Sequence, residues 1–131
     1  MNRETRGRHL LLVEDNPAIA ELMSEQLASL GYSVDCALDG NRGVTMACTG
    51  DYAAMLLDLD LPEYDGVEVL HILRKRMVKR RLPVIVITGD VERTRLRDLN
   101  RESIDGYLIK PVDLAALSHE LDRAITAVQV A

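Results

Sequence analysis

The chain has 131 residues, of which 47% are hydrophobic and 28% are charged, and its formal net charge is −5. This composition excludes a disordered chain and predicts one soluble globular domain over residues 1–131. No apolar stretch approaches the roughly 20 residues that a membrane span needs. The two cysteines are too few for a disulfide framework, so we expect a cytoplasmic protein with no membrane contact.

The first third of the chain alternates between strand-like and helix-like segments. Residues 10–13 and 32–34 are short apolar runs, which are typical of buried strands. Between them a helix is predicted by a stripe of side chains at helical spacing: Ile19, Leu22, Met23, Gln26, Leu27 and Leu30. Pro17 suits the first turn of this helix, and Gly31 suits its end. A weaker helical pattern follows near residues 40–49.

The same alternation continues to the end of the chain. Three further apolar runs lie at residues 53–57, 84–87 and 107–109. Two more helices are predicted by the stripes Val67, Leu70, Leu73 and Met77, and Leu114, Leu117, Leu121, Ile125 and Val128. Asp113 is a suitable N-cap for the last of them. Residues 91–102 carry few apolar side chains, so they form either a thinly packed helix or a mobile one.

Strands and helices that alternate five times predict an α/β fold. Parallel strands need crossover connections, and helices provide them on both faces of a sheet. We therefore expect a single three-layer domain with a five-stranded parallel sheet and five flanking helices. In such sheets the functional crevice lies at the carboxyl ends of the strands.

Polar side chains follow four of the five predicted strands. Glu14 and Asp15 follow the first, Asp58 the third, Thr88 the fourth and Lys110 the fifth. Carboxylates at close range need a cation or a shifted proton, and oxygen ligands of this kind suit Mg²⁺. An amine and a hydroxyl could hold phosphoryl oxygens. The chemistry that fits is attack by a carboxylate on phosphorus.

Four segments carry a resemblance to a known family: LLLVEDN (10–16), LLDLDLPEYDG (56–66), VIVITG (84–89) and GYLIKP (106–111). Together they resemble the CheY-like receiver domain of two-component response regulators. The resemblance runs over about residues 8–127, which it implies to be the folded core. The intervals of 43, 30 and 22 residues between Asp15, Asp58, Thr88 and Lys110 are similar to those of the family. The resemblance implies a flavodoxin-like sheet with the strand order 2-1-3-4-5.

The resemblance also implies what the site residues do. Asp58 would accept a phosphoryl group from a histidine kinase or a histidine phosphotransfer protein. Glu14, Asp15 and Asp58, with the backbone carbonyl of Asp60, would hold Mg²⁺. The catalytic residues would be Asp58, Thr88 and Lys110, of which the last two would hold the phosphoryl oxygens. Such a domain catalyses only its own phosphorylation and slow dephosphorylation.

Other positions would control the response. By the same resemblance, Tyr107 would turn inward as Thr88 moves toward the phosphoryl group, and the 91–125 face would change its affinity for an effector or for a second copy. The bond between Lys110 and Pro111 would be cis. Asp60, Gly89 and Asp90 would modulate the site: Gly89 leaves access to Asp58 open, and the two charges would either repel the phosphoryl group or orient a water.

Two rival functions and one question of context remain at this point. Asp58-Leu59-Asp60 resembles the D-x-D motif of haloacid-dehalogenase-like phosphatases, in which the second aspartate is an acid and base. That motif usually follows the first strand of a longer chain, whereas here it follows the third. A pure interaction module would not need the complete set of site residues. The chain is either a stand-alone receiver or a part of a longer regulator or hybrid kinase.

A basic cluster, RKRMVKRR (74–81), is the remaining unusual segment. It could be a solvated helix end, a surface for an acidic protein, or a nucleic-acid contact. Basic residues suit a helix C-terminus, and no aromatic side chains interleave for stacking on bases. We therefore expect no direct nucleic-acid binding.

Overall fold

The computed structural model describes residues 8–61, 66–78, 80–89 and 104–130. Its five strands form one parallel sheet in the order β2-β1-β3-β4-β5, which confirms the predicted order. The strands are β1 (His9–Val13), β2 (Ser33–Ala37), β3 (Ala54–Asp58), β4 (Val84–Thr88) and β5 (Gly106–Ile109). The helices of the described residues are α2 (Pro17–Ser29), α3 (Gly40–Thr49), α4 (Gly66–Arg76) and α6 (Leu114–Val130).

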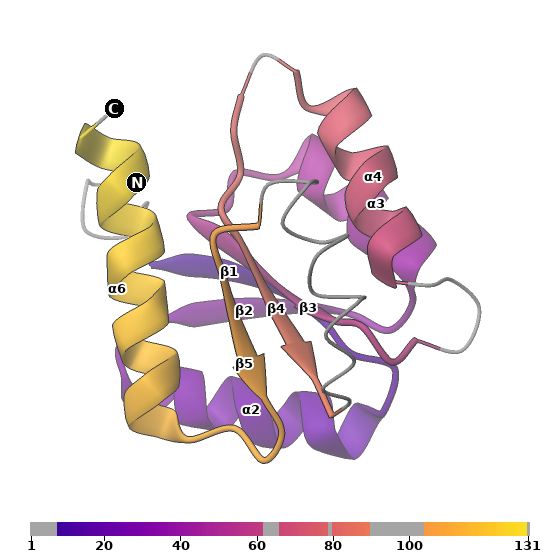
Figure 1. Cartoon of the computed structure of the whole chain (residues 1–131). Helices are drawn as coiled ribbons and strands as arrows, with labels where there is room; N and C mark the ends of the chain where they lie inside the picture. Colours follow the sequence, from indigo (N-terminus) through magenta and orange to yellow (C-terminus); the bar gives the residue numbers. More distant parts are fainter. Residues whose placement is uncertain (1–7, 62–65, 79, 90–103, 131) are drawn as a thin grey trace.

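The helices cover both faces of the sheet, so the fold is a three-layer α/β fold (Figure 1). One core, against α3 and α4, contains Leu11 and Val13 of β1. The other core, against α2 and α6, contains Leu10 and Leu12. Because successive side chains of a strand point to opposite faces, an unbroken apolar run supplies both cores at once.

Four helices were found where the sequence predicts them. The fifth predicted helix, at residues 91–102, lies outside the described residues, so it stays a prediction. No helix in the described part of the chain has the length and apolar character to cross a membrane.

Local signals explain where the helices begin and end. Asn16 accepts hydrogen bonds from the N–H groups of Ala18 and Ile19, which caps α2 just before Pro17. Gly31 has φ +93° after that helix, as a C-terminal glycine does. Asp113 accepts from the N–H of Ala116, so its predicted N-cap role in α6 is confirmed.

Two sequence predictions need correction. β2 spans Ser33–Ala37 rather than 32–34, because an edge strand is only partly buried and contains polar residues. The stripe on α2 is wider than the surface that α2 buries: Ala20 and Leu27 are buried, whereas Ile19 is 41% exposed and Leu22 is 54% exposed. These two exposed side chains border the functional edge of the sheet.

Candidate functional site

The parallel register brings the strand-end residues to one edge. Asp58 is the last residue of β3 and lies opposite Ile87, and Thr88 is the last residue of β4 and lies opposite Ile109. The N–H of Lys110 then donates to the carbonyl of Thr88 at 2.9 Å, which extends the pairing by one residue. The bond between Lys110 and Pro111 is cis, as predicted.

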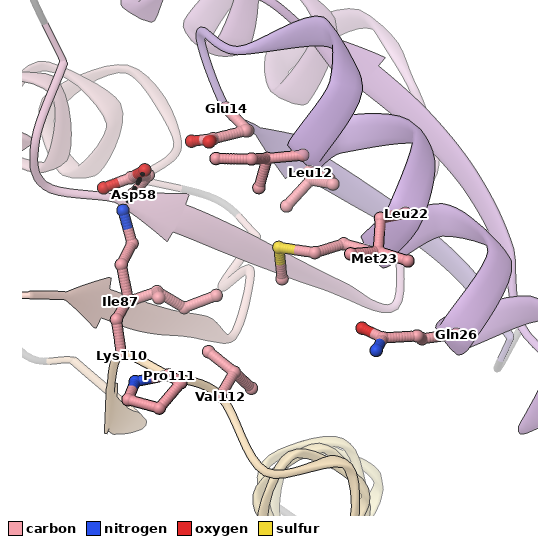
Figure 2. Close-up of a pocket in the computed structure, with 11 residues that line it drawn as sticks. Leu12, Glu14, Leu22, Met23, Gln26, Asp58, Ile87, Lys110, Pro111 and Val112 are labelled. Carbon is pink, nitrogen blue, oxygen red and sulfur yellow. Dashed lines mark hydrogen bonds and ion pairs between the residues drawn. The ribbon is translucent and has the colours of Figure 1, made fainter.

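Asp58 is at the centre of this edge. It is only 3% exposed, although it is a carboxylate. Its Oδ2 lies 2.8 Å from Nζ of Lys110, and its Oδ1 accepts from the N–H of Asp60 at 2.8 Å. In Figure 2 the Lys110 amine and the Glu14 carboxylate both point toward Asp58. Each oxygen of Asp58 therefore already has a donor.

Three carboxylates gather at this position. Glu14, Asp15 and Asp58 each offer an oxygen, and these oxygens lie within 4.8 Å of one another. Glu14 is 2% exposed, and its Oε2 has no hydrogen-bond partner among the described residues. A buried carboxylate oxygen without a donor is costly for the folded protein. A cation at this point would satisfy it.

Burial and mutual contacts shift the pKa values of Glu14, Asp58 and Lys110. Burial, followed by a hydrogen bond to Asp58, raises the pKa of Glu14 to about 8. Burial acts to raise the pKa of Asp58 as well, but hydrogen bonds from Glu14 and Lys110 outweigh it, and the pKa of Asp58 is lowered. Burial likewise opposes the charge on Lys110, but its contacts with Asp58 raise the pKa of the amine. These shifts favour an ionised Asp58, a charged Lys110 and a protonated Glu14 in the metal-free site.

The other predicted site residues differ in their exposure. Thr88 is buried at the end of β4, whereas the Tyr107 side chain is 49% exposed on β5. Gly89 is exposed beside the site. Asp90 lies outside the described residues, so its role stays untested.

Sequence reasoning missed two features of the site. The first is the direction of the Asp60 side chain, whose Oδ2 accepts from the N–H of Gly89 at 3.2 Å and lies 3.7 Å from Nζ of Lys110. The second is a cavity of about 300 Å³ between α2 and the segment after β5. Only the excess width of the α2 stripe could have indicated this cavity.

The cavity is apolar along most of its length and polar at one end. Figure 2 shows Leu22 and Met23 of α2 on one side of it and Pro111 and Val112 on the other. At the polar end it reaches the carboxylates of Glu14 and Asp58 and the amine of Lys110, which also line it. An apolar surface thus leads directly to the buried carboxylate.

Comparison with known proteins agrees with this geometry. The family model of the response regulator receiver domain matches residues 10–122. Transcriptional regulatory protein HprR of Escherichia coli is 37% identical over 109 residues, which are 82% of this chain and 47% of that protein. Transcriptional regulatory protein TctD of Salmonella typhimurium is 37% identical over 113 residues, which are 86% of this chain and 49% of that protein. The chain therefore spans about half the length of these curated relatives.

A solved structure is similar as well. The receiver domain of the sensor histidine kinase PA1611 of Pseudomonas aeruginosa has a TM-score of 0.82 and 34% identity, over 92% of this chain and 98% of that one. It is described as having a magnesium ion coordinated in its active site cleft. Because the family model matches most of the chain, this protein belongs to the response regulator receiver domains, a family of signalling domains.

Proposed function

We propose that Asp58 is the phosphoryl acceptor of this receiver domain. One observation carries the proposal: Asp58 is a buried, ionised carboxylate with a lysine amine 2.8 Å away and two further acids beside it. A structural carboxylate would be adequately paired by Lys110 alone. The additional acids, which repel one another without a cation, suit a site that accepts a charged group.

The reaction is phosphoryl transfer from a phosphohistidine. A carboxylate oxygen of Asp58 forms a bond to phosphorus while the bond between phosphorus and the imidazole nitrogen breaks, and the electron pair of that bond stays with the imidazole. The ammonium of Lys110 pairs with a phosphoryl oxygen, and the hydroxyl of Thr88 donates to another. Hydrolysis of the acyl phosphate later restores the carboxylate. The domain is an enzyme only for these two steps on its own side chain.

Mg²⁺ is the cofactor that the donor set fits. Glu14, Asp15 and Asp58, together with the backbone carbonyl of Asp60, would hold the ion, since Mg²⁺ prefers a few carboxylates and retains water. The unpartnered Oε2 of Glu14 supports this assignment. When bound, the ion neutralises negative charge on the acids and on the transferred group. Its binding also replaces the proton that Glu14 holds in the metal-free site.

The donor is a histidine kinase or a histidine phosphotransfer protein that approaches over the cavity beside α2. Ile19 and Leu22 are exposed there, and the polar end of the cavity reaches Asp58. Exposed apolar side chains next to a reactive group are typical of a protein contact.

Phosphorylation would be transmitted through Thr88 and Tyr107 to the 91–125 face. The exposed Tyr107 ring would turn inward when Thr88 moves toward the phosphoryl group, and the affinity for an effector would then change. A transcriptional regulator and a sensor histidine kinase are both among its relatives, and both contexts would use the same site.

Labelling by radioactive acetyl phosphate tests the acceptor. The wild-type chain should take up label with Mg²⁺ and lose this ability in EDTA, and Asp58→Asn should take up none. Asp51→Asn is the matched control, because Asp51 is an exposed acid that pairs with Arg80. It lies before β3, at the other end of the strand from Asp58. Persistent labelling of Asp58→Asn would place the acceptor elsewhere. Absence of label in the wild-type chain would favour an interaction module.

The protein donor is tested with a phosphorylated histidine phosphotransfer protein. Leu22→Asp should reduce transfer from this donor by at least about tenfold, since a charge in an apolar contact costs several kcal/mol. It should leave labelling by acetyl phosphate unchanged. Val78→Asp is the control, because Val78 is 78% exposed and does not line the cavity. Equal effects of the two variants would contradict docking over α2.

A further inference from the structure

The side chain of Asp60 crosses the mouth of the site from the end of β3 to the end of β4. Its Oδ2 accepts from the N–H of Gly89 at 3.2 Å and lies 3.7 Å from Nζ of Lys110. The same amine lies 2.8 Å from Oδ2 of Asp58. One lysine therefore serves two carboxylates, of which Asp58 is buried and Asp60 is 39% exposed.

A phosphoryl group on Asp58 would need the donors that Asp60 now uses. The transferred group has three oxygens and two negative charges at neutral pH, and it requires cationic and N–H donors close to the acceptor. Lys110 and the backbone N–H that follows Thr88 are such donors on the β4 and β5 side of Asp58. The Asp60 carboxylate has the same charge sign and the same preference for donors as a phosphoryl oxygen.

We propose that the Asp60 carboxylate occupies a phosphoryl-oxygen position in the resting domain, as an internal competitor for Gly89 N–H and Lys110. The inference rests on the proposed role of Asp58. Asp60 must leave these donors before a phosphoryl group can use them, so it slows phosphorylation and limits the affinity of the site for oxyanions. It takes no part in bond making: phosphorus gains the bond to Asp58, and the leaving group keeps its electron pair.

The environment of Asp60 lets its side chain leave. Its carboxylate is partly exposed, and it is held by one hydrogen bond from the N–H of Gly89 and by the longer approach to Lys110. Neighbouring atoms leave room around the carboxylate, because even a Cβ added at Gly89 would lie 3.6 Å from Oδ2 of Asp60 and 3.8 Å from Cδ of Lys110. Asp60 therefore competes through charge and hydrogen bonding rather than through a rigid lock.

The rate of labelling separates this role from the alternative, in which Asp60 orients a water. Asp60→Asn retains an oxygen for the N–H of Gly89 but removes the charge. We expect labelling by acetyl phosphate to become about fivefold faster, as the loss of one nearby like charge allows. Asp51→Asn, with the same change in net charge far from Gly89, should label at the wild-type rate.

Each other outcome overturns the inference. An unchanged labelling rate with slower hydrolysis would assign Asp60 to the water, and the role of Asp58 would stand. Complete loss of labelling in Asp60→Asn would make Asp60 an acid and base, as in a D-x-D phosphatase. Absence of label in the wild-type chain would instead remove the proposed function itself.

A second measurement reads the contact without any phosphoryl transfer. In the metal-free protein in EDTA, the amide of Gly89 should exchange its hydrogen several-fold faster in Asp60→Ala than in the wild-type chain. Binding of inorganic phosphate in the presence of Mg²⁺ can be measured through the Gly89 amide signal. Phosphate should bind about fivefold more tightly to Asp60→Asn than to the wild-type chain. An unchanged Gly89 amide and an unchanged affinity for phosphate would show that Asp60 does not occupy the position.

Discussion

Two acidic side chains of the domain, Glu14 and Tyr52, are each buried next to a carboxylate, and this environment raises their pKa. At the carboxyl edge, Glu14 is held neutral by burial and by its hydrogen bond to Asp58. At the opposite edge, the Tyr52 hydroxyl donates to Oδ2 of Asp35 at 2.8 Å. In both pairs burial, and then the neighbouring carboxylate, disfavours the ionised form of the acid and raises its pKa. The first pair lies beside a third carboxylate, Asp15, whereas the second lies beside His9, whose Nε2 is 3.1 Å from Oδ2 of Asp35.

The Tyr52 pair predicts how stability depends on alkaline pH. Burial, and then the hydrogen bond to Asp35, raises the pKa of Tyr52 to about 12 from 10.0. Since the folded pKa is above the unfolded one, the contribution is complete below pH 10 and is lost as the pH rises toward 12. Urea unfolding at several pH values should show this fall in the wild-type chain.

Tyr52→Phe is the variant that isolates the effect. It should be less stable by about 1 kcal/mol at pH 7, because it lacks the hydrogen bond to Asp35. Its stability should then fall less steeply than that of the wild-type chain above pH 10. Parallel pH profiles for the two proteins would show that Tyr52 ionises equally in the folded and unfolded states.

Asp105 joins several elements at the amino edge of the sheet. Its side chain receives the guanidinium groups of Arg74 and Arg81 at 3.3 and 2.7 Å, and the N–H of Val84 donates to it at 2.8 Å. Arg123 of α6 donates to its backbone carbonyl. Two arginines of the basic cluster thus contribute to the fold itself, and Arg80 pairs with Asp51.

Removal of this carboxylate should destabilise the domain. In Asp105→Ala, Val84 N–H and two guanidinium groups lose a partner that is only 14% exposed, so we expect a loss of about 3 kcal/mol in the free energy of unfolding. Urea unfolding at pH 7 measures it. Asp51→Ala should change stability by less than about 1 kcal/mol, because its pair with Arg80 is exposed. Similar losses in both variants would contradict the special role of Asp105.

The alternation of elements could be predicted because it depends on local patterns. All five strands and the four described helices follow from apolar runs, helical stripes and turn residues. The boundaries were less accurate: β3 and β4 include Asp58 and Thr88, because pairing with Ile87 and Ile109 extends each strand by one polar residue. Such pairing depends on the neighbouring strand and has no signal in the segment itself.

The site residues could be predicted because their positions at strand ends follow from topology. The direction of a loop side chain could not be predicted, because it depends on the backbone of the loop and on distant partners. The contact of Asp60 with Gly89 joins residues that are 29 apart in sequence, and the pair of Arg74 with Asp105 joins residues 31 apart. Neither leaves a pattern in composition or spacing.

The parallel sheet places the site residues and the stabilising pairs in different parts of the domain. The carboxyl ends of the strands gather the acids, the amine and the apolar cavity on one edge (Figure 2). The opposite edge contains the stabilising pairs of Asp35 and Asp105. The stabilising pairs therefore lie away from the site. Within the site, the close carboxylates act against folding. A ligand that relieves their repulsion should stabilise the entire molecule.

This coupling predicts that Mg²⁺ raises the melting temperature. An ion that binds only the folded state stabilises it by about 1.4 kcal/mol at ten times its dissociation constant, or roughly 5 °C for a domain of this size. Calorimetry over a series of MgCl₂ concentrations measures the shift, with NaCl at equal ionic strength as the comparison.

Asp15→Asn should melt at a higher temperature than the wild-type chain in EDTA, because one of three close carboxylates is neutralised. The same variant should lose most of the Mg²⁺-dependent shift, whereas Asp51→Asn should retain it. A shift that NaCl reproduces, or that Asp15→Asn retains in full, would mean that the three carboxylates do not form the metal site.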